Sequence, residues 1–377
     1  MAIAAGASNL YFSRDTKVFI AQGSNIWEIP VLNGYAFNQT TNTSEVTLSE
    51  MSDSAGNSRR GRKVFTDSIA PAEWSFTAYV RPTLDNAKVR AVEEVLWANF
   101  VAANTYTPAT PAWASGVAIG ASALDFDFSA SNKTTLGVFD IYFVLGANSV
   151  SGRNYAANGD TTIYKVPSAS INEASITFDI DGIATIAWSG MGGKRTEVTS
   201  FDASAAINIG TTSTGNFIRN RITQLGITSS VSGSSKTYNV VLTGGTVTFT
   251  NNLTYLTPEV LGIVNTPLGH VTGTRTIGGN FTAYLDEQTN GTIDLVEDLS
   301  NATTQVTNSF ALDFYVGGKA AGDAPRAPGM QFKIPNAHLS IPNIEVNDVV
   351  GISVDFSALP SSISAADEVT KISYVAA

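Results

Sequence analysis

The segment AEWSFTAYVRP, residues Ala72–Pro82, alternates apolar and polar side chains and so has the two-residue period of a β-strand with one buried face. Pro82 would end this strand because proline has no backbone N–H to donate to a neighbouring strand. The segment NFTAYLDE, residues Asn280–Glu287, repeats the central letters FTAY 205 positions further along the chain. The repetition predicts that one β-rich module occurs twice.

Other segments match in the same order along the two halves of the chain. The matched pairs are YAFNQT (35–40) with VTFTNN (247–252), ALDF (123–126) with ALDF (311–314), and YKVPSASI (164–171) with FKIPNAHL (332–339). The last pair predicts that Ile176, Phe178, Ile186 and Trp188 correspond to Ile344, Val346, Val354 and Phe356. A conserved order favours an internal duplication over the chance reuse of alternating strings.

We expect a mainly β fold of two β-sandwich or barrel modules, each with one flanking α-helix. The expected divisions are an N-terminal arm (1–17), a first module (18–200) with a long loop (45–73), a linker with a lead-in strand (201–235), a second module (236–360) and a C-terminal arm (361–377). Insertions in the first module would lie in loops, where they cost little.

The composition narrows the function. The 377 residues are 43% hydrophobic but only 14% charged, and the formal net charge is −10. An acidic chain is poorly suited to bind nucleic acid by neutralising phosphates. Cysteine is absent, which excludes disulfides and thiolate metal sites. We expect no secretory signal and no membrane-spanning segment, because no apolar run approaches eighteen residues.

Two helices and two hairpins are expected from local signals. Asp85 could cap a helix whose apolar face is Val89, Val92, Leu96 and Phe100, and a shorter helix is expected within 290–301. Asp181-Gly182 and Asn347-Asp348 each separate two alternating runs and predict tight turns in the last hairpin of each module.

No catalytic motif is present, so we expect neither enzymatic activity nor a cofactor or metal. His270 and His338 are 68 positions apart without a partner pattern, and His338 falls within an alternating strand. The carboxylates of Asp125 and Asp127 would share one strand face, but the second copy has Tyr315 in place of Asp127. A solvated strand face explains this pair better than a catalytic pair.

One basic cluster interrupts the sparsely charged chain. Arg59, Arg60, Arg62 and Lys63 lie inside the expected long loop, and the second copy has no equivalent cluster. The cluster is either a solvated loop tip or a contact with a neighbouring subunit or ring. Nucleic-acid binding is disfavoured because no aromatic residues are interleaved with the basic ones.

Taken together, these features resemble the tail tube (major tail) proteins of long-tailed phages. The resemblance lies in the order of an N-terminal segment (SNLYFSRDTKVFIAQG), a long loop, the strand EWSFTAYVRP, a helix and the final hairpin ASITFDIDGIATIAWSG. It implies a virion structural protein whose strands join those of neighbouring subunits into a channel for DNA. It also implies that the long loop and the terminal arms bridge successive rings.

Two modules in one chain would need only three chains to form a ring of six modules, so we expect a homotrimer; a ring of six chains is the alternative. Implied partners are other tail proteins, such as the tape measure, terminator and baseplate and possibly a sheath, and the tube would be assembled in the host cytoplasm without a membrane. The lumen-facing candidates, on the polar face of the last hairpins, are Thr177, Asp179, Thr185, Glu345, Ser353 and Asp355. A tandem carbohydrate- or cell-surface-binding protein, with Trp27, Trp74, Trp97, Trp113 and Trp188 as stacking platforms, is the alternative function.

Overall fold

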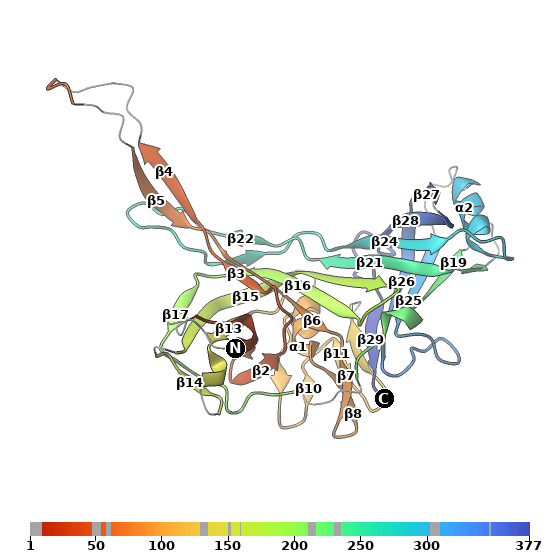
Figure 1. Cartoon of the computed structure of the whole chain (residues 1–377), viewed down its shortest axis with the longest axis horizontal. Coiled ribbons are helices and arrows are strands. Elements are labelled where there is room, and N and C mark those ends of the chain that lie inside the picture. The colour runs from red at the N-terminus through yellow and green to blue at the C-terminus, as the bar shows by residue number, and fades with distance from the viewer. Residues whose placement is uncertain are drawn as a thin grey trace.

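The computed structural model describes residues 10–46, 54–57, 62–128, 135–149, 152–158, 160–209, 216–229, 235–301, 310–346 and 348–377. The expectation of a mainly β fold is confirmed, and these ranges contain two α-helices, α1 (Glu94–Val101) and α2 (Thr292–Asn301). Short 3₁₀ turns occur at Ser13–Asp15, Ala147–Ser149 and Asn220–Ile222. Figure 1 shows an elongated molecule from which a two-stranded arm projects at one end.

Seven strands of the first half form an open series of antiparallel pairs, which is called a strand circuit below. In this circuit β2 pairs with β1, β1 with β13, β13 with β15, β15 with β16, β16 with β6, and β6 with β3. The strands are β1 (Lys17–Gln22), β2 (Asn25–Ile29), β3 (Ala36–Asn38), β6 (Ala72–Tyr79), β13 (Phe139–Leu145), β15 (Thr162–Asp179) and β16 (Thr185–Gly192).

The second half contains a circuit with the same order of pairs. Here β20 pairs with β19, β19 with β25, β25 with β26, β26 and β27 with β28, β28 with β24, and β24 with β21. The strands are β19 (Gln224–Ser229), β20 (Lys236–Asn239), β21 (Leu242–Thr250), β24 (Thr276–Tyr284), β25 (Phe310–Val316), β26 (Gly329–Leu339), β27 (Asn343–Val346) and β28 (Val350–Ala358).

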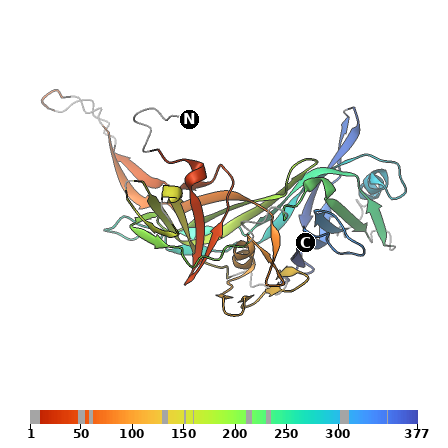
Figure 2. The same ribbon diagram turned by 60° about the horizontal axis from the view of Figure 1, so that its bottom comes forward.

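The strands β15 and β21 pair with each other and so fuse the two halves into one antiparallel sheet. Eight strands follow one another in the order β3, β6, β16, β15, β21, β24, β28, β27, where β15 contributes residues 173–179. This arrangement is called the inner sheet below. Figure 2 shows the two halves side by side, with long strands spanning the space between them.

A second connection between the halves is β29 (Lys371–Val375), which pairs with β12 (Leu124–Asp127) of the first half and with β26 of the second. Residues 371–375 fall within the expected C-terminal arm, yet they form a strand inside the fold. Ile372 and Tyr374 of this strand are fully buried. Two short strands lie outside the inner sheet: β11 (Val117–Ile119) pairs with β12, and β17 (Thr196–Val198) pairs with the first part of β15.

The position of β12 corrects one matched pair of segments. ALDF at 123–126 lies in β12, whereas ALDF at 311–314 lies in β25, and it is β13 that has the place of β25 in the order of pairs. The short string recurs because both strands bury a Leu and a Phe on alternate positions. The identity of the letters therefore does not mark equivalent strands.

Helix α1 is shorter than expected and begins at Glu94 rather than after Asp85. Residues before it form a hairpin of β7 (Pro82–Asp85) and β8 (Lys88–Ala91), with Asn86 and Ala87 at positive φ in the turn. Two consecutive residues with positive φ are typical of the tight turns that suit a twisted hairpin. In the second half, the expected helix is confirmed as α2, which buries Leu295 and Leu299.

Helix α1 is buried on all sides between the two halves, in one continuous apolar core. The Trp97 indole makes edge contacts with Trp188 of the first half and Phe249 of the second, at centroid distances of 4.8 and 5.3 Å. Its Nε1–H donates to the hydroxyl of Tyr374 in β29 at 2.7 Å. The helix therefore supports both the inner sheet and the strand that joins the halves.

The last hairpins differ in how tightly they turn. Pairing between β15 and β16 ends at Thr177 and Thr185, so the connection is longer than the expected two-residue turn at Asp181-Gly182. Ile183 forms instead an isolated bridge with Arg219, which draws this segment away from the ladder. In the second half, Val346 lies opposite Val350 and the turn is tight as expected, although Asn347 is outside the described residues.

The remaining strands form small two-stranded units on the surface. They are β4 (Thr41–Val46) with β5 (Lys63–Ile69), β9 (Tyr106–Thr107) with β10 (Ala112–Trp113), β14 (Asn154–Ala156) with β18 (Ser200–Asp202), and β22 (Thr254–Leu256) with β23 (Gly269–Val271).

Candidate assembly surfaces

The inner sheet has one apolar face, packed on the core, and one polar face that no other layer of the described residues covers. Directly opposed residues of neighbouring strands share a face. Thr177 lies opposite both Thr185 and Thr246, Asp355 lies opposite Asn280, and Ser353 lies opposite Thr282. Asp179 lies opposite Gly244 and Glu345 lies opposite Gly351 on the same face. All six residues expected to face a lumen therefore lie on this polar face.

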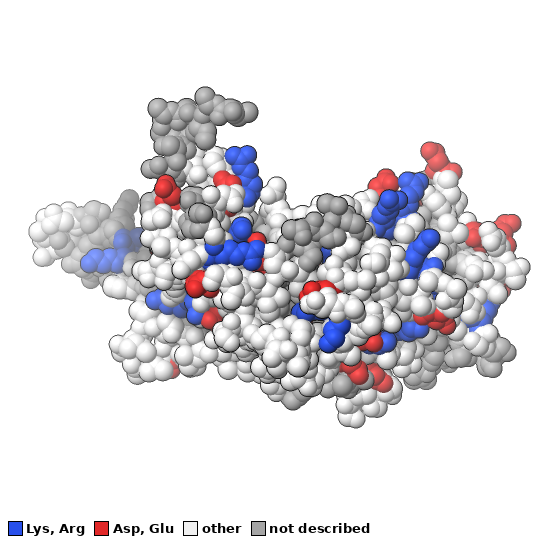
Figure 3. All heavy atoms as spheres, turned by 90° about the horizontal axis from the view of Figure 1, so that it is seen from below, with Lys and Arg blue, Asp and Glu red and all other residues white. Residues whose placement is uncertain are grey.

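The polar face is acidic. It carries the carboxylates of Glu73, Glu173, Asp179, Glu345 and Asp355, and the eight strand segments that build it contain neither Lys nor Arg. On the face seen in Figure 3, by contrast, Lys and Arg side chains are interspersed with Asp and Glu. The inner sheet therefore presents a surface of one sign, which repels phosphates.

Two edges of the inner sheet are unpaired within the described part of the chain. The edge strand β3 pairs with β6 alone, and β27 pairs with β28 alone. All four residues of β27 are exposed, including Ile344 at 55% and Val346 at 79%. Edge strands invite pairing with another chain through their outward backbone groups, although in β3 the carbonyl of Phe37 already accepts from the Arg195 guanidinium at 3.2 Å.

The arm formed by β4 and β5 follows β3 directly. All residues of β4 are exposed, and Val46, Val64 and Phe65 contribute apolar surface. Within the basic cluster, Arg62 lies 3.4 Å from the carboxylate of Glu45 across the arm, while Lys63 begins β5. Arg59 and Arg60 are outside the described residues. Because β4 and β5 pair, the stretch expected as a loop (45–73) is in part a β-hairpin.

A second hairpin, β22–β23, follows β21 as the arm follows β3, and it lies on the first half. The hydroxyl of Tyr255 donates to the carbonyl of Ser168 at 2.8 Å, and Nδ1 of His270 lies 3.0 Å from Oγ of Ser170. Ser170 is consequently fully buried. The loop between β22 and β23 (257–268) is uncharged apart from Glu259 and exposes Leu261 and Ile263. The second half thus has an apolar hairpin at the place where the first half has the arm with the basic cluster.

The base of this second hairpin is locked into the first half by Arg275. Its guanidinium donates to the carbonyl of Val101 at 3.1 Å, contacts the ring of Phe128, and donates to the amide oxygen of Asn251 at 3.1 Å. Val101 is the last residue of α1, where cations are favourable. Burial lowers the pKa of Arg275 to about 10, and the nearby carboxylate of Glu368 opposes this shift.

A second group of buried charges surrounds the start of α1. Arg90 donates to the Glu94 carboxylate and, at 3.0 Å, to the hydroxyl of Tyr106. Glu93 is 1% exposed, and its burial raises the pKa of its carboxyl to about 7, although nearby Arg81 favours ionisation. Neither group of buried charges was expected from the sequence. The sequence does contain two signals of buried charge: the adjacent carboxylates Glu93 and Glu94 within an apolar run, and the single Arg275 among Thr and Gly residues.

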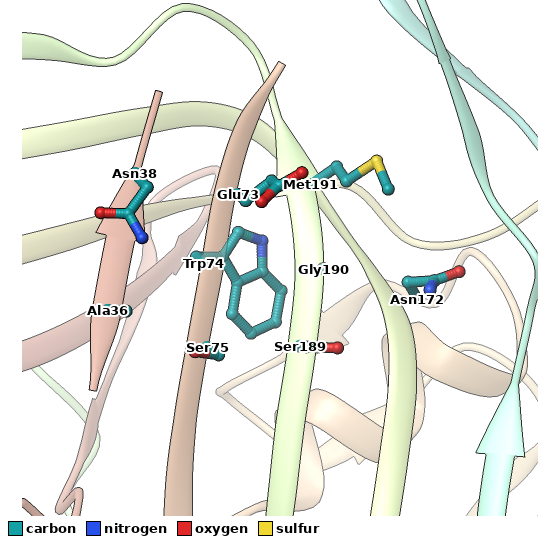
Figure 4. A pocket seen from close by; sticks show the side chains of 9 residues that line it. All are labelled: Ala36, Asn38, Glu73, Trp74, Ser75, Asn172, Ser189, Gly190 and Met191. Carbon is teal, nitrogen blue, oxygen red and sulfur yellow. The ribbon is translucent and has the colours of Figure 1, made fainter. Parts of the chain in front are cut away.

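A pocket of about 210 Å³ opens at the end of the inner sheet beside the edge strand β3 (Figure 4). Its lining residues are Ala36, Asn38, Glu73, Trp74, Ser75, Asn172, Ser189, Gly190 and Met191. Gly190 makes room for the indole of Trp74, since a Cβ there would lie 2.5 Å from the ring. Glu73 is the one ionisable residue of this lining, so the pocket has no pair of groups for acid–base chemistry.

The other chemical candidates have structural roles. Asp125 accepts hydrogen bonds from Lys371 and Ser373 of β29, and His338 lies in β26 as expected. All five tryptophans are buried, so none is a stacking platform for a sugar. Within the described ranges, no group of three or more potential metal ligands occurs and no helix is long and apolar enough to cross a membrane.

No protein-family model matches the sequence. The sequence is 31% identical over 373 residues to "Tail tube protein pb6" of Escherichia phage T5. The matched region covers 96% of this chain and 75% of that protein.

Proposed function

The chain belongs to the phage tail tube protein family and has a structural role in the virion tail, and from this premise we propose that three copies close into a ring of six equivalent modules. The rings stack into the tube through which DNA leaves the capsid. The role is structural and not catalytic. Assembly takes place in the host cytoplasm, with the tape measure, terminator and baseplate proteins, and a sheath in contractile tails, as neighbouring tail components.

The matching strand circuits of the two halves support the duplication. Both circuits have the same six steps of pairing, and both contain the same irregularity at the same place. Pairing shifts between Phe139 and Ile141 in β13 and between Phe310 and Leu312 in β25. A bulge at a matching position is a specific local feature, and bulges persist within families.

The junction between the halves is a template for the junction between chains. At the internal junction β15 pairs with β21, and Ser175 lies opposite Thr248. At the two outer edges of the inner sheet, β27 has the place that β15 has at the internal junction, and β3 has the place of β21. We infer that β27 of one chain pairs with β3 of the next and so closes the inner sheets into a barrel, which leaves no free edge.

The FTAY segments set the register of this pairing. Asn38 lies opposite Glu73, three residues before Phe76, and Thr248 lies opposite Gly278, three residues before Phe281. Asn38 therefore takes the place of Thr248, two residues before Thr250, on which the match of YAFNQT with VTFTNN had placed it.

The same reasoning applies at the other edge. Ser175 lies opposite Ala187, which faces Thr77 of the first FTAY, and Asn343 lies opposite Ser353, which faces Thr282 of the second. Asn343 therefore takes the place of Ser175. The same register gives Ile186 and Trp188 the places of Ile352 and Val354, two residues before the Val354 and Phe356 expected from the sequence. The register places Asn343 of one chain opposite Asn38 of the next.

In the closed ring the polar face of the inner sheet lines the lumen. Its carboxylates give the lumen a negative charge that repels DNA, so DNA slides through without specific binding. The observation that carries the proposal is the single eight-stranded sheet, with an uninterrupted acidic face and two edges that match the internal junction.

A disulfide experiment tests the ring. The chain has no cysteine, so a variant with Asn38→Cys and Asn343→Cys has only these two thiols. We expect oxidation of assembled tubes to give covalent trimers as the largest closed product. Ser175→Cys with Thr248→Cys is the matched control, because these hydroxyls lie 3.2 Å apart within one chain and should cross-link without joining chains.

The register and the symmetry are checked separately. Moving the second cysteine two residues along, to Glu345→Cys, should abolish the link between chains. Absence of any interchain product from the first pair, in tubes whose control pair does react, would refute the ring closure. Electron micrographs of the purified tube distinguish threefold from sixfold symmetry and so exclude one of the trimer and the six-chain ring.

A further inference from the structure

We propose that the arm β4–β5 of one chain docks along β26 of the neighbouring chain in the same ring, beside His338. This inference rests on the proposed ring closure and adds the partner surface of the arm. The occupant of that surface is a second copy of this chain.

The hairpin of the second half that is equivalent to the arm is already docked inside the chain. The hairpin β22–β23 continues from β21 and lies against β15, where Tyr255 contacts Ser168 and His270 contacts Ser170. The arm continues from β3 in the same way. A strand pairing that seats β3 against a neighbour therefore carries the arm along that neighbour.

The receiving surface exists and is empty within the described residues. Ser170 follows Ala169, which lies opposite Phe139, while His338 follows Ala337, which lies opposite Phe310. The two residues thus hold the same place after the same irregularity. Ser170 is buried beneath the hairpin, whereas His338 is exposed.

Two apolar side chains close to His338 along the chain or across the strand pair are exposed within the described residues. Ile341 is 61% exposed and Leu359 is 41% exposed, and the backbone N–H of Leu359 donates to Asn336, two residues before His338. The arm brings complementary apolar groups, since Val46, Val64 and Phe65 are each about half exposed. Val46 and Phe65 lie on one face of the arm and Val64 on the other, so docking removes the exposed groups beside β26 and those of one face of the arm from water.

The arm has little support of its own beyond its base, where the backbone N–H of Ile69 donates to the carbonyl of Asn265 in the second hairpin at 2.8 Å. A two-stranded hairpin is only marginally stable in water when nothing packs on it. Every residue of β4, and the first five of β5, are exposed in the single chain. A persistent strand pairing in such a hairpin is expected where an assembly partner covers it.

A short bismaleimide cross-linker tests the docking in assembled tubes. Two variants, Val64→Cys with His338→Cys and Phe65→Cys with His338→Cys, sample both faces of the arm. The matched control is Asn42→Cys with Ser68→Cys, whose native side chains are hydrogen-bonded at 2.8 Å on the surface of the arm and which should react within one chain. We expect at least one test variant to give covalent dimers and trimers.

The outcomes separate this inference from the ring itself. If neither test variant joins chains in tubes where Asn38→Cys and Asn343→Cys do, the arm docks elsewhere and the inference is wrong while the ring stands. If both pairs fail and the control reacts, ring closure and docking fail together.

Hydrogen exchange of the unmodified chain gives an independent check. Amides of 63–69 and of 335–341 should both exchange at least about tenfold more slowly in tubes than in free subunits, because docking covers both. Exchange of either segment at the free rate in tubes would overturn the docking.

Discussion

Replacing Arg275 by Met should destabilise the whole chain, because Arg275 is the charged link between the two halves. The guanidinium is 4% exposed and Glu368 is 3% exposed, and the positive charge acts on this carboxylate. Arg275→Met preserves the length of the side chain but removes the charge and the hydrogen bonds to Val101 and Asn251. Breaking a buried charge pair on one side costs about 3–5 kcal/mol.

The assay is urea denaturation of the free subunit, followed by fluorescence of the buried tryptophans. The core is continuous through both halves, so we expect one transition. With an m-value of about 3 kcal/mol per molar urea, the midpoint should fall by about 1 M or more. The double variant Arg275→Met with Glu368→Gln should recover a large part of the loss, because the unpaired carboxylate is then neutral.

Two results would contradict this reasoning. A loss below about 0.5 kcal/mol for Arg275→Met would show that the link is not a stabilising one. Equal losses in the single and double variants would show that the cost comes from lost hydrogen bonds and packing and not from an uncompensated charge on Glu368.

Three further predictions concern pH, the lumen and the arm. Because the pKa of Glu93 is raised from 4.5 to about 7 in the folded chain, its stabilising contribution is full below pH 4.5 and disappears as the pH rises through 7. Glu93→Gln should remove about 3 kcal/mol of the pH dependence of the free energy of unfolding. The change is followed as the difference in melting temperature between pH 5 and pH 8. Asp179→Lys with Asp355→Lys should make tubes retain double-stranded DNA at low salt and release it at high salt, whereas unmodified tubes should retain none. Serine at the four basic positions within 59–63 should weaken tube formation in light scattering, yet shift unfolding by less than about 0.5 kcal/mol because the Arg62–Glu45 pair is exposed.

Local periodicity predicted the parts of the fold that depend on local sequence. The strand around Phe76 alternates as expected, and the FTAY segments do occupy matching places in the order of pairs. The turn between Val346 and Val350 and the helix ending at Asn301 also followed from neighbouring residues. In each case the deciding interactions lie within a few positions of one another.

The rest depends on partners far apart in the chain. Tyr374 belongs to a strand that forms between β12 and β26, and nothing near it in sequence indicates that position. The apolar positions Val89 and Val92 fit a helix as well as a hairpin followed by a helix, so periodicity could not place the start of α1. The edges β3 and β27 became candidates only when the order of the eight strands was known.

The strand β29 has a consequence for the order of events during synthesis. Every strand that it joins precedes it in the chain, so the ribosome releases β12 and β26 before the segment that sits between them. A nascent chain therefore lacks one of the two connections that hold its halves at a fixed angle. Under the proposed ring closure, we expect a shortened product of interrupted translation that lacks β29 to be excluded from rings, because its two halves are then joined at one place fewer.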